Sequence, residues 1–213
     1  GVEGGFGRDF TPLDSCLIAG PAWWFYLGKF LLPVNLVAIY PMWSLSAGEG
    51  WQIGCVAAAI ILLAILWMMC GRIGPAPVAA AASYTVLILP VLGFIDFGFL
   101  GHAFVADHFF YRPSIPIVFI IVWLIGGFRL RTDAAVMTAG IGGALVIGAL
   151  FVLTWRQSRI YRDAETFWRH NAEIHPTHTA YQNLAEIAWK RGDARETIDL
   201  ASKSIGLQDN ARA

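Results

Sequence analysis

The chain has 213 residues, of which 57% are hydrophobic and only 14% are charged, and its formal net charge is zero. Soluble domains carry about 25% charged residues. The sequence shows no basic patch of the kind that nucleic-acid binding requires, so we expect no nucleic-acid partner. Charges are sparse from Cys16 to Thr154 and frequent from Arg156 onward. This shift predicts a membrane region over residues 1–155, with the lipid bilayer as a partner, and a soluble tail over residues 156–213.

The first apolar segment, residues 17–43, is aromatic and is interrupted by prolines. We expect one broken or interfacial helix, with Lys29 reaching toward water. Aromatic rings with one polar end favour the headgroup level of a membrane. The rings that we expect there belong to Trp23, Trp24, Tyr26, Tyr40 and Trp43.

Four further apolar segments predict membrane spans, because a helix needs about 20 apolar residues to cross a bilayer. The second contains Pro90, which we expect to kink it, and the fourth is rich in glycine, which favours close helix packing. The predicted fold is therefore all-α, a multi-spanning transmembrane helical bundle followed by a helical tail. The spans are predicted at residues 51–70, 75–95, 115–128 and 134–155.

Loop charges leave the orientation of these spans open. Arg72 and Arg129 lie in loops on one side, whereas Arg156, Arg159 and Arg162 follow the last span on the other. The rule that positive loops stay in the cytoplasm slightly favours a cytoplasmic tail. The three cysteines, Cys16, Cys55 and Cys70, are expected to pack as small apolar side chains rather than to form a disulfide framework.

The tail contains one helical repeat over about residues 178–211. One face of its first helix is predicted to carry Tyr181, Leu184, Ala185 and Ala188, and its second helix to be lined by Ile198, Ala201 and Ile205. A turn at Gly192-Asp193 joins the two helices. This pattern resembles the tetratricopeptide repeat, which has a period of about 34 residues. Ala164–His175 is predicted as the second helix of a preceding half-repeat.

The candidate site is the segment from Asp96 to Ser114, which holds most polar residues of the membrane half. Ionisable groups at membrane depth are costly and mark functional sites. One interpretation is a solvated or interfacial loop in which Asp107 pairs with Arg112 or caps a helix. A second is a binding site for a polar head group, such as a phosphate held by His108 and Arg112.

A third interpretation of this segment is a metal site using His102, Asp107 and His108. The spacing of these three residues matches no familiar ligand pattern, so we assign no metal-binding residues. The sequence contains no phosphate-binding glycine loop, nucleophile elbow or paired-cysteine motif. The tail histidines, His170, His175 and His178, are expected to be solvated.

Three stretches, in the right order, resemble polytopic membrane proteins with C-terminal tetratricopeptide repeats. VADHFFYRPS, residues 105–114, resembles their V-A-D-H/R-x-x-Y-x-x-S segment. Residues 25–43 resemble their Y-x-x-K-x-x-x-P-x-N-L-x-x-x-Y-P stretch, and residues 155–168 resemble the junction before the repeats. This group includes the transmembrane and tetratricopeptide-repeat mannosyltransferases and bacterial relatives, and their membrane part is similar to glycosyltransferases of the C superfamily.

The resemblance implies a glycosyltransferase that uses a polyprenyl-phosphate-linked sugar at the extracytoplasmic face. It implies a bacterial inner-membrane protein with an extracytoplasmic tail, against the weak charge count. The substrate-binding residues it suggests are Asp107, His108, Tyr111 and Arg112, although Arg112 stands where an apolar residue is usual.

The chain begins with Gly1, and its last residues break off as a repeat ends, so we expect a C-terminal fragment. The acidic catalytic residues of such enzymes lie in an earlier loop, so no catalytic residue is assigned and no cofactor is expected within the fragment. The resemblance leaves room for the sugar donor and a divalent metal in the parent protein. The repeats would bind an acceptor or partner protein. The alternative is a non-enzymatic membrane scaffold, and a transporter ranks third because the spans carry little charge.

Overall fold

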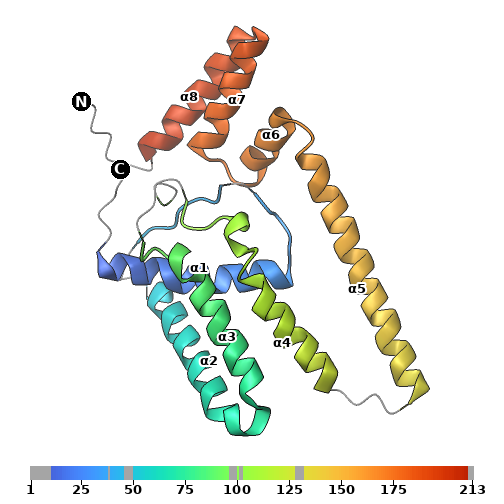
Figure 1. Cartoon of the computed structure of the whole chain (residues 1–213). Coiled ribbons are helices and arrows are strands. Elements are labelled where there is room, and N and C mark those ends of the chain that lie inside the picture. Colours follow the sequence, from blue (N-terminus) through green and yellow to red (C-terminus); the bar gives the residue numbers. More distant parts are fainter. Residues whose placement is uncertain are drawn as a thin grey trace. The chain divides into compact units, whose positions relative to one another are not determined.

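The computed structural model describes residues 11–37, 39–45, 50–95, 100, 103–127 and 132–210, with side chains described to residue 207. Within these residues the chain is all-helical and contains no β-strand, as the sequence predicts (Figure 1). Its α-helices are α1 Pro12–Leu31, α2 Trp51–Ile73, α3 Pro75–Ile88, α4 Ser114–Gly127, α5 Asp133–Ile160, α6 Ala164–Ile174, α7 His178–Arg191 and α8 Ala194–Asn210. The 3-10 helices η2 Leu89–Val91 and η4 Asp107–Phe110 lie between α3 and α4.

The chain forms two compact units. The first contains residues up to Pro33 together with Met42–Met137, and so holds α1 to α4. The second contains Val34–Pro41 and the chain from Thr138 onward. The predicted division after residue 155 was drawn from polarity and lies inside α5.

Helix α1 begins earlier than predicted because Thr11 caps it. The Thr11 hydroxyl accepts from the backbone N–H of Asp14, and the Asp14 carboxylate accepts from the backbone N–H of Thr11. This reciprocal pair satisfies two backbone donors at the helix start. Pro21 lies inside the helix without ending it, so the predicted broken helix is one continuous helix to Leu31 followed by a non-helical segment.

Close packing against α2 buries the middle of α1. A Cβ added at Gly20 would lie 2.6 Å from Val56 Cγ2 and 2.8 Å from its backbone nitrogen, so only glycine permits this approach. The indole nitrogen of Trp24 donates to the carbonyl of Cys55 at 2.9 Å. Trp23 and Tyr26, which were predicted at headgroup level, are buried within the unit. Their rings therefore serve in packing between protein segments.

Helix α3 is shorter than the predicted span 75–95. It ends at Ile88, and Pro90 lies in η2 instead of kinking a longer helix. Proline lacks the N–H that an α-helix needs and disfavours the helical conformation of the residue before it. Gly93 then turns the chain with a φ of 86°, and a Cβ there would lie 3.2 Å from Ile18.

Among the described helices, α2 and α5 are long and apolar enough to cross a membrane. Their 23 and 28 residues correspond to about 35 and about 42 Å, and a bilayer core is about 30 Å thick. The other two predicted spans correspond to shorter apolar helices, Pro75–Val91 and Ser114–Gly127. Two of the four predicted spans thus have helices of spanning length.

Helices α7 and α8 form the hairpin predicted over residues 178–211, and Gly192 ends α7 in the left-handed conformation. The predicted face of α7 is confirmed, because Leu184, Ala185 and Ala188 lie in a core cluster with Tyr181 against it. The prediction for α8 was partly wrong. Leu200 is buried in this cluster and Ala201 packs on it, whereas Ile198 and Ile205 are exposed.

Candidate functional site

The candidate loop is anchored by a buried stretch immediately before η4. Residues 103–106 are all buried, although they form no helix. The backbone N–H of Ala106 donates to the Tyr26 hydroxyl at 3.0 Å, which satisfies a buried donor. The last turns of α1 therefore fix the position at which η4 begins.

An aromatic cluster from α1 and α3 packs against η4. The ring of Phe110 stacks on Tyr26, with centroids 5.7 Å apart and planes at 9°, and meets the edges of Phe30 and Tyr84. The Tyr84 hydroxyl donates to the carbonyl of Trp23 at 2.6 Å. Stacked and edge-to-face pairs of this kind add about 0.5–1.5 kcal/mol each beyond burial. Helices α1 and α3 thus determine where the polar residues of η4 lie.

Asp107 is the first residue of η4 and is half-buried. Its carboxylate attracts the Lys29 ammonium, which also lies 5.6 Å from the centroid of the Phe25 ring. Lys29 therefore joins the candidate site, although the sequence predicted only that it reaches toward water. The sequence feature that could have pointed to Lys29 is that it is a single lysine in a mostly apolar and aromatic segment.

The other three predicted residues lie on the surface. His108, Tyr111 and Arg112 are all exposed, Tyr111 at 76%. The Ser114 hydroxyl donates to the carbonyl of Tyr111 at 2.8 Å where α4 begins. The structure therefore brings Asp107 to Lys29 and leaves His108, Tyr111 and Arg112 facing outward beside α4.

The metal interpretation named His102, Asp107 and His108. His102 lies outside the described residues, as does Asp96 of the same loop. Within the described part of the chain, no group of three His, Cys, Asp or Glu side chains could hold a metal ion. The functional groups of the site are a carboxylate, an ammonium, an imidazole, a phenol and a guanidinium. The hydrogen-bond donors of this set are suited to binding an anion.

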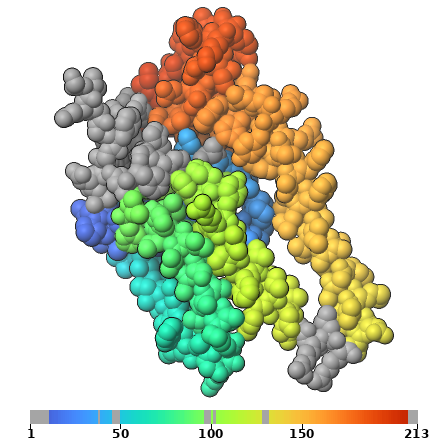
Figure 2. Space-filling view, in the orientation of Figure 1, coloured from blue at the N-terminus to red at the C-terminus, as the bar shows by residue number. Residues whose placement is uncertain are grey.

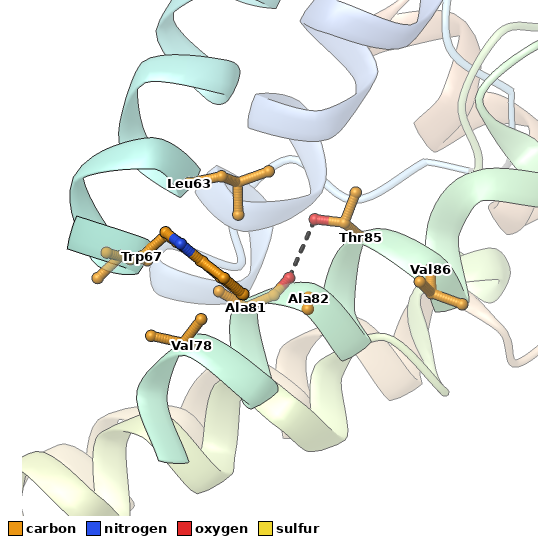
Figure 3. A pocket seen from close by; sticks show the side chains of 8 residues that line it. Leu63, Trp67, Val78, Ala81, Ala82, Thr85 and Val86 are labelled. Carbon is orange, nitrogen blue, oxygen red and sulfur yellow. Dashed lines mark hydrogen bonds between the residues drawn. The ribbon is translucent and has the colours of Figure 1, made fainter. Parts of the chain in front are cut away.

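Two apolar grooves run beside α3. One, of about 260 Å³, lies between α2 and α3, where Leu63 and Trp67 face Val78, Ala81 and Ala82 (Figure 3). Its polar group, the Thr85 hydroxyl, donates to the carbonyl of Ala81 at 3.0 Å and accepts from the Trp23 indole at 3.2 Å. Apart from this hydroxyl and the indole N–H of Trp67, the groove is lined by apolar side chains.

The second groove, of about 340 Å³, lies between α3 and α4. Its wall on α4 includes Ile115 and Phe119, which are exposed. Its α3 side consists of small side chains. Helix α4 starts two residues after Arg112, so this groove begins directly beside the polar loop. The lining residues are Ala76, Ala79, Ala80, Ser83, Ile115, Pro116 and Phe119.

The segment 34–41, which carries part of the resemblance, packs within the second unit. Gln157 Nε2 donates to the carbonyl of Leu36 at 3.2 Å, and Val37 and Tyr40 are buried. Asn35 adopts a positive φ of 52°, a conformation that asparagine tolerates better than most residues. The Asn-Leu and Tyr positions of this stretch therefore serve local packing and a turn.

The three tail histidines are half-buried and so are less solvated than predicted. The His175 ring lies 5.8 Å from the Tyr40 ring, and His178 Nε2 lies 3.2 Å from the Thr179 hydroxyl. His170 Nε2 is buried without a hydrogen-bond partner among the described residues. The helix pairs cover part of each ring, which surface composition alone does not reveal.

Four charged residues join the three tail helices. Arg169 contacts Glu165 and Glu196 at 2.7 Å each, and Arg191 contacts the same two carboxylates. Hydrogen bonds from Arg169 and then Arg191 hold the pKa of Glu165 below its usual value. This network of ion pairs lies at the surface and links α6, α7 and α8 to one another. We do not assign it as a ligand site.

Comparisons of the chain with protein-family models, with curated proteins and with solved structures gave no match.

Proposed function

We propose that this chain is part of an integral membrane glycosyltransferase-like protein that uses a polyprenyl-phosphate-linked sugar. The observation that carries the proposal is a polar loop, rich in cation-forming groups, held at the end of apolar helices. Lys29 and Arg112 offer positive charge there, His108 offers a ring N–H, and Asp107 lies among them. A lipid-linked phosphate needs such a head-group site next to apolar surface.

The membrane setting is supported by exposed apolar surface on α5. None of its described side chains is buried, and Leu145 and Ile147 are each 70% exposed. Figure 2 draws the surface of this helix in yellow to orange. Soluble monomers rarely expose contiguous apolar patches larger than a few hundred Å². A helix that is apolar on all sides requires lipid or other helices around it. We therefore place α2 and α5 across a bilayer, with α3 and α4 as further members of a multi-spanning bundle.

In the proposed site, Arg112 and His108 bind the donor phosphate, and Asp107 orients Lys29 beside it. Arginine suits phosphate because its planar guanidinium can donate two parallel hydrogen bonds. Tyr111 offers a hydroxyl at the same surface. The catalytic base and any divalent metal would come from other parts of the natural protein.

The hairpin of α7 and α8 is proposed to be a tetratricopeptide repeat that presents an acceptor protein. Small residues, Ala185 and Ala188, lie where the two helices pack, and Gly192 makes the turn. The tail would lie outside the cytoplasm of a bacterial inner membrane. A single cysteine at Gly206, in a background lacking the native cysteines, would react with an impermeant thiol reagent on intact cells if this is correct. Protection until the cells are permeabilised would place the tail inside.

The enzymatic proposal is tested in the natural protein that contains this chain. Arg112→Ala and Asp107→Ala are expected to reduce sugar transfer from a polyprenyl-phosphate donor without loss of folded protein. Arg72→Ala, at the far end of α2, is the matched control and should retain transfer. Wild-type transfer in both loop variants would remove this assignment.

A membrane-anchored scaffold is the second candidate, and the exposed side chains of the hairpin favour it. Ile198, Ile205 and Trp189 are each well over half exposed on α7 and α8. Repeat proteins bury such surface against a neighbouring repeat or a partner. Absence of transfer activity together with loss of a bound partner in an Ile198→Asp variant would favour the scaffold.

A further inference from the structure

We propose that the end of α5 binds the head group of an anionic phospholipid of the surrounding bilayer through Arg156, Arg159 and Arg162. The inference rests on one part of the proposed function, namely that α5 crosses the bilayer. Neither the proposed donor site nor the core of the hairpin uses these three arginines.

Helix α5 changes from apolar to cationic in its last turns. Residues 134–154 include no charged side chain and correspond to about 31 Å, close to the thickness of a hydrocarbon core, about 30 Å. When this stretch fills the core, Trp155 lies where tryptophan is favoured, at the membrane–water interface. Arg156 and Arg159 then lie at the level of the lipid head groups.

One face of this end carries both the aromatic rings and a guanidinium. Phe151, Trp155 and Arg159 follow one another at intervals of four residues and therefore lie along the same side of the helix. All three are exposed, and the rings of Phe151 and Trp155 stack with centroids 6.4 Å apart. A lipid on this face would place its acyl chain against the two rings and its phosphate beside Arg159.

The arginines lack the acidic partners that would neutralise them. The sequence contains no acidic residue between Asp133 and Asp163. Within the described part of the chain, Arg156 and Arg159 form no ion pair, and Arg162 contacts Asp163 once, at 3.4 Å and largely in solvent. The positive charge of this segment is therefore available to a lipid with a net negative head group.

The turn between α5 and α6 keeps Arg162 close to Arg159 (Figure 1). The backbone N–H of Arg162 donates to the carbonyl of Arg159 at 3.4 Å, so the two residues lie one turn apart. The ring of Tyr161 packs at 5.2 Å from that of Phe167 in α6. Two guanidinium groups at this spacing can both donate to one lipid phosphate, which a single exposed arginine cannot reproduce.

The charge also decides between possible occupants of this face. In a symmetric contact with a second copy of the chain, the same arginines would face one another and repel. Phosphatidylcholine has a phosphate, but its choline cation balances the charge. An anionic phospholipid satisfies both the apolar and the cationic part of the face.

The test uses the whole chain in nanodiscs of phosphatidylcholine that contain a small fraction of phosphatidylglycerol with a diazirine near the glycerol end of one acyl chain. After irradiation, adducts are mapped by peptide mass spectrometry. We expect them on segment 151–155, at a level at least about fivefold above that given by phosphatidylcholine with the same diazirine. Equal labelling by the two lipids would overturn the proposal.

The arginines are tested one at a time and together. Arg159→Gln should reduce phosphatidylglycerol adducts on segment 151–155 about fivefold, as expected for one charge at an anionic surface. Arg159→Gln combined with Arg162→Gln should reduce them to the phosphatidylcholine level. Arg159→Lys should retain most of the labelling, and Arg72→Gln, at the end of α2, should retain all of it. Unchanged labelling in the double variant would overturn the proposal.

Failure of the lipid site is distinguishable from failure of the proposed function. If α5 does not cross the bilayer, neither lipid labels any part of it. Adducts elsewhere on α5 but none on segment 151–155 would mean that protein covers this face, which contradicts the lipid site alone. Sugar transfer by the natural protein is assigned to the polar loop, so normal transfer with equal labelling by both lipids would also remove only the lipid site.

Discussion

Helix α5, from Thr138 onward, and the hairpin of α7 and α8 belong to the same compact unit, but they place their apolar side chains differently. In α5 no described side chain is buried, although most are apolar. In the hairpin, apolar side chains such as Leu184 and Leu200 face inward, and lysines and arginines face outward. The pattern of the hairpin stabilises its folded state in water, and the pattern of α5 is stable only in an apolar environment.

The difference shows that an apolar helix can need an apolar environment even where the rest of the chain does not bury it. The hairpin obtains its apolar environment from its own two helices. Helix α5 obtains none from the described residues, so lipid or other helices must provide it. Matched substitutions in the two regions should therefore have opposite effects on stability and on membrane integration.

The largest expected effect is on local stability in the hairpin. Leu184→Ala should reduce the free energy of opening α7 by about 2–5 kcal/mol, because it leaves a cavity in a packed cluster. The matched variant in α5, Leu145→Ala, should change local stability by less than about 0.5 kcal/mol, as for an exposed site. Hydrogen exchange of the whole chain in nanodiscs measures both. Similar losses at the two sites would contradict the comparison.

Membrane integration should respond in the reverse order. Ile147→Arg, near the middle of α5, should cost about 2.5–3.5 kcal/mol of insertion free energy. Ile198→Arg, which is 68% exposed on α8, should leave insertion unchanged. Carbonate extraction of membranes, followed by quantification of the pelleted chain, distinguishes the two. Release of both variants into the soluble fraction would break the assignment of α5.

A smaller effect is expected at the start of α7. The Thr177 hydroxyl accepts from the backbone N–H of Ala180 at 3.3 Å, so Thr177→Ala should destabilise the hairpin by about 1 kcal/mol. Ser202→Ala, an exposed position on α8, serves as the control. Hydrogen exchange should increase in the first turn of α7 for the first variant only. An equal increase in both would mean that the cap contributes nothing.

The smallest expected effect concerns the network of ion pairs that links the three tail helices. The pKa of Glu165 is held below 4.5 by Arg169 and Arg191. Its contribution to stability is therefore fully present above that value and is lost as pH falls through the lowered pKa. The hairpin should melt at lower temperature in acid than at neutral pH, and less so in Glu165→Gln. An unchanged pH dependence in this variant would exclude Glu165 as a source, and added salt should weaken the effect.

The sequence predicted the hairpin well because its signals are local. The period of apolar residues in α7 and the glycine at 192 define both the helix and its end. The start of α1 was equally readable from Thr11 and Asp14 but was missed. The face of α8 was predicted to carry Ile198, Ala201 and Ile205, since a stripe of apolar residues normally faces the core. Of these three, Ala201 packs against the core, and Leu200 is buried in it.

The candidate site was predictable only in part. Its polar residues stand out against apolar neighbours, so Asp107, His108, Tyr111 and Arg112 could be selected. The role of Lys29 could not, because it lies 78 positions before Asp107 and only tertiary packing brings the two together. The burial of residues 103–106 has the same origin, since no regular period marks a buried loop.

The most direct test of the account is the accessibility of α5 in native membranes. Single cysteines would be placed at Ile147 and at Ser158, in a background in which Cys16, Cys55 and Cys70 are replaced, and treated with an impermeant maleimide on both sides of the membrane. If α5 crosses the membrane, position 158 is labelled and position 147 is not, because position 147 would then lie in the hydrocarbon core. Equal labelling at both positions would show that α5 does not cross the membrane and would contradict the central claim.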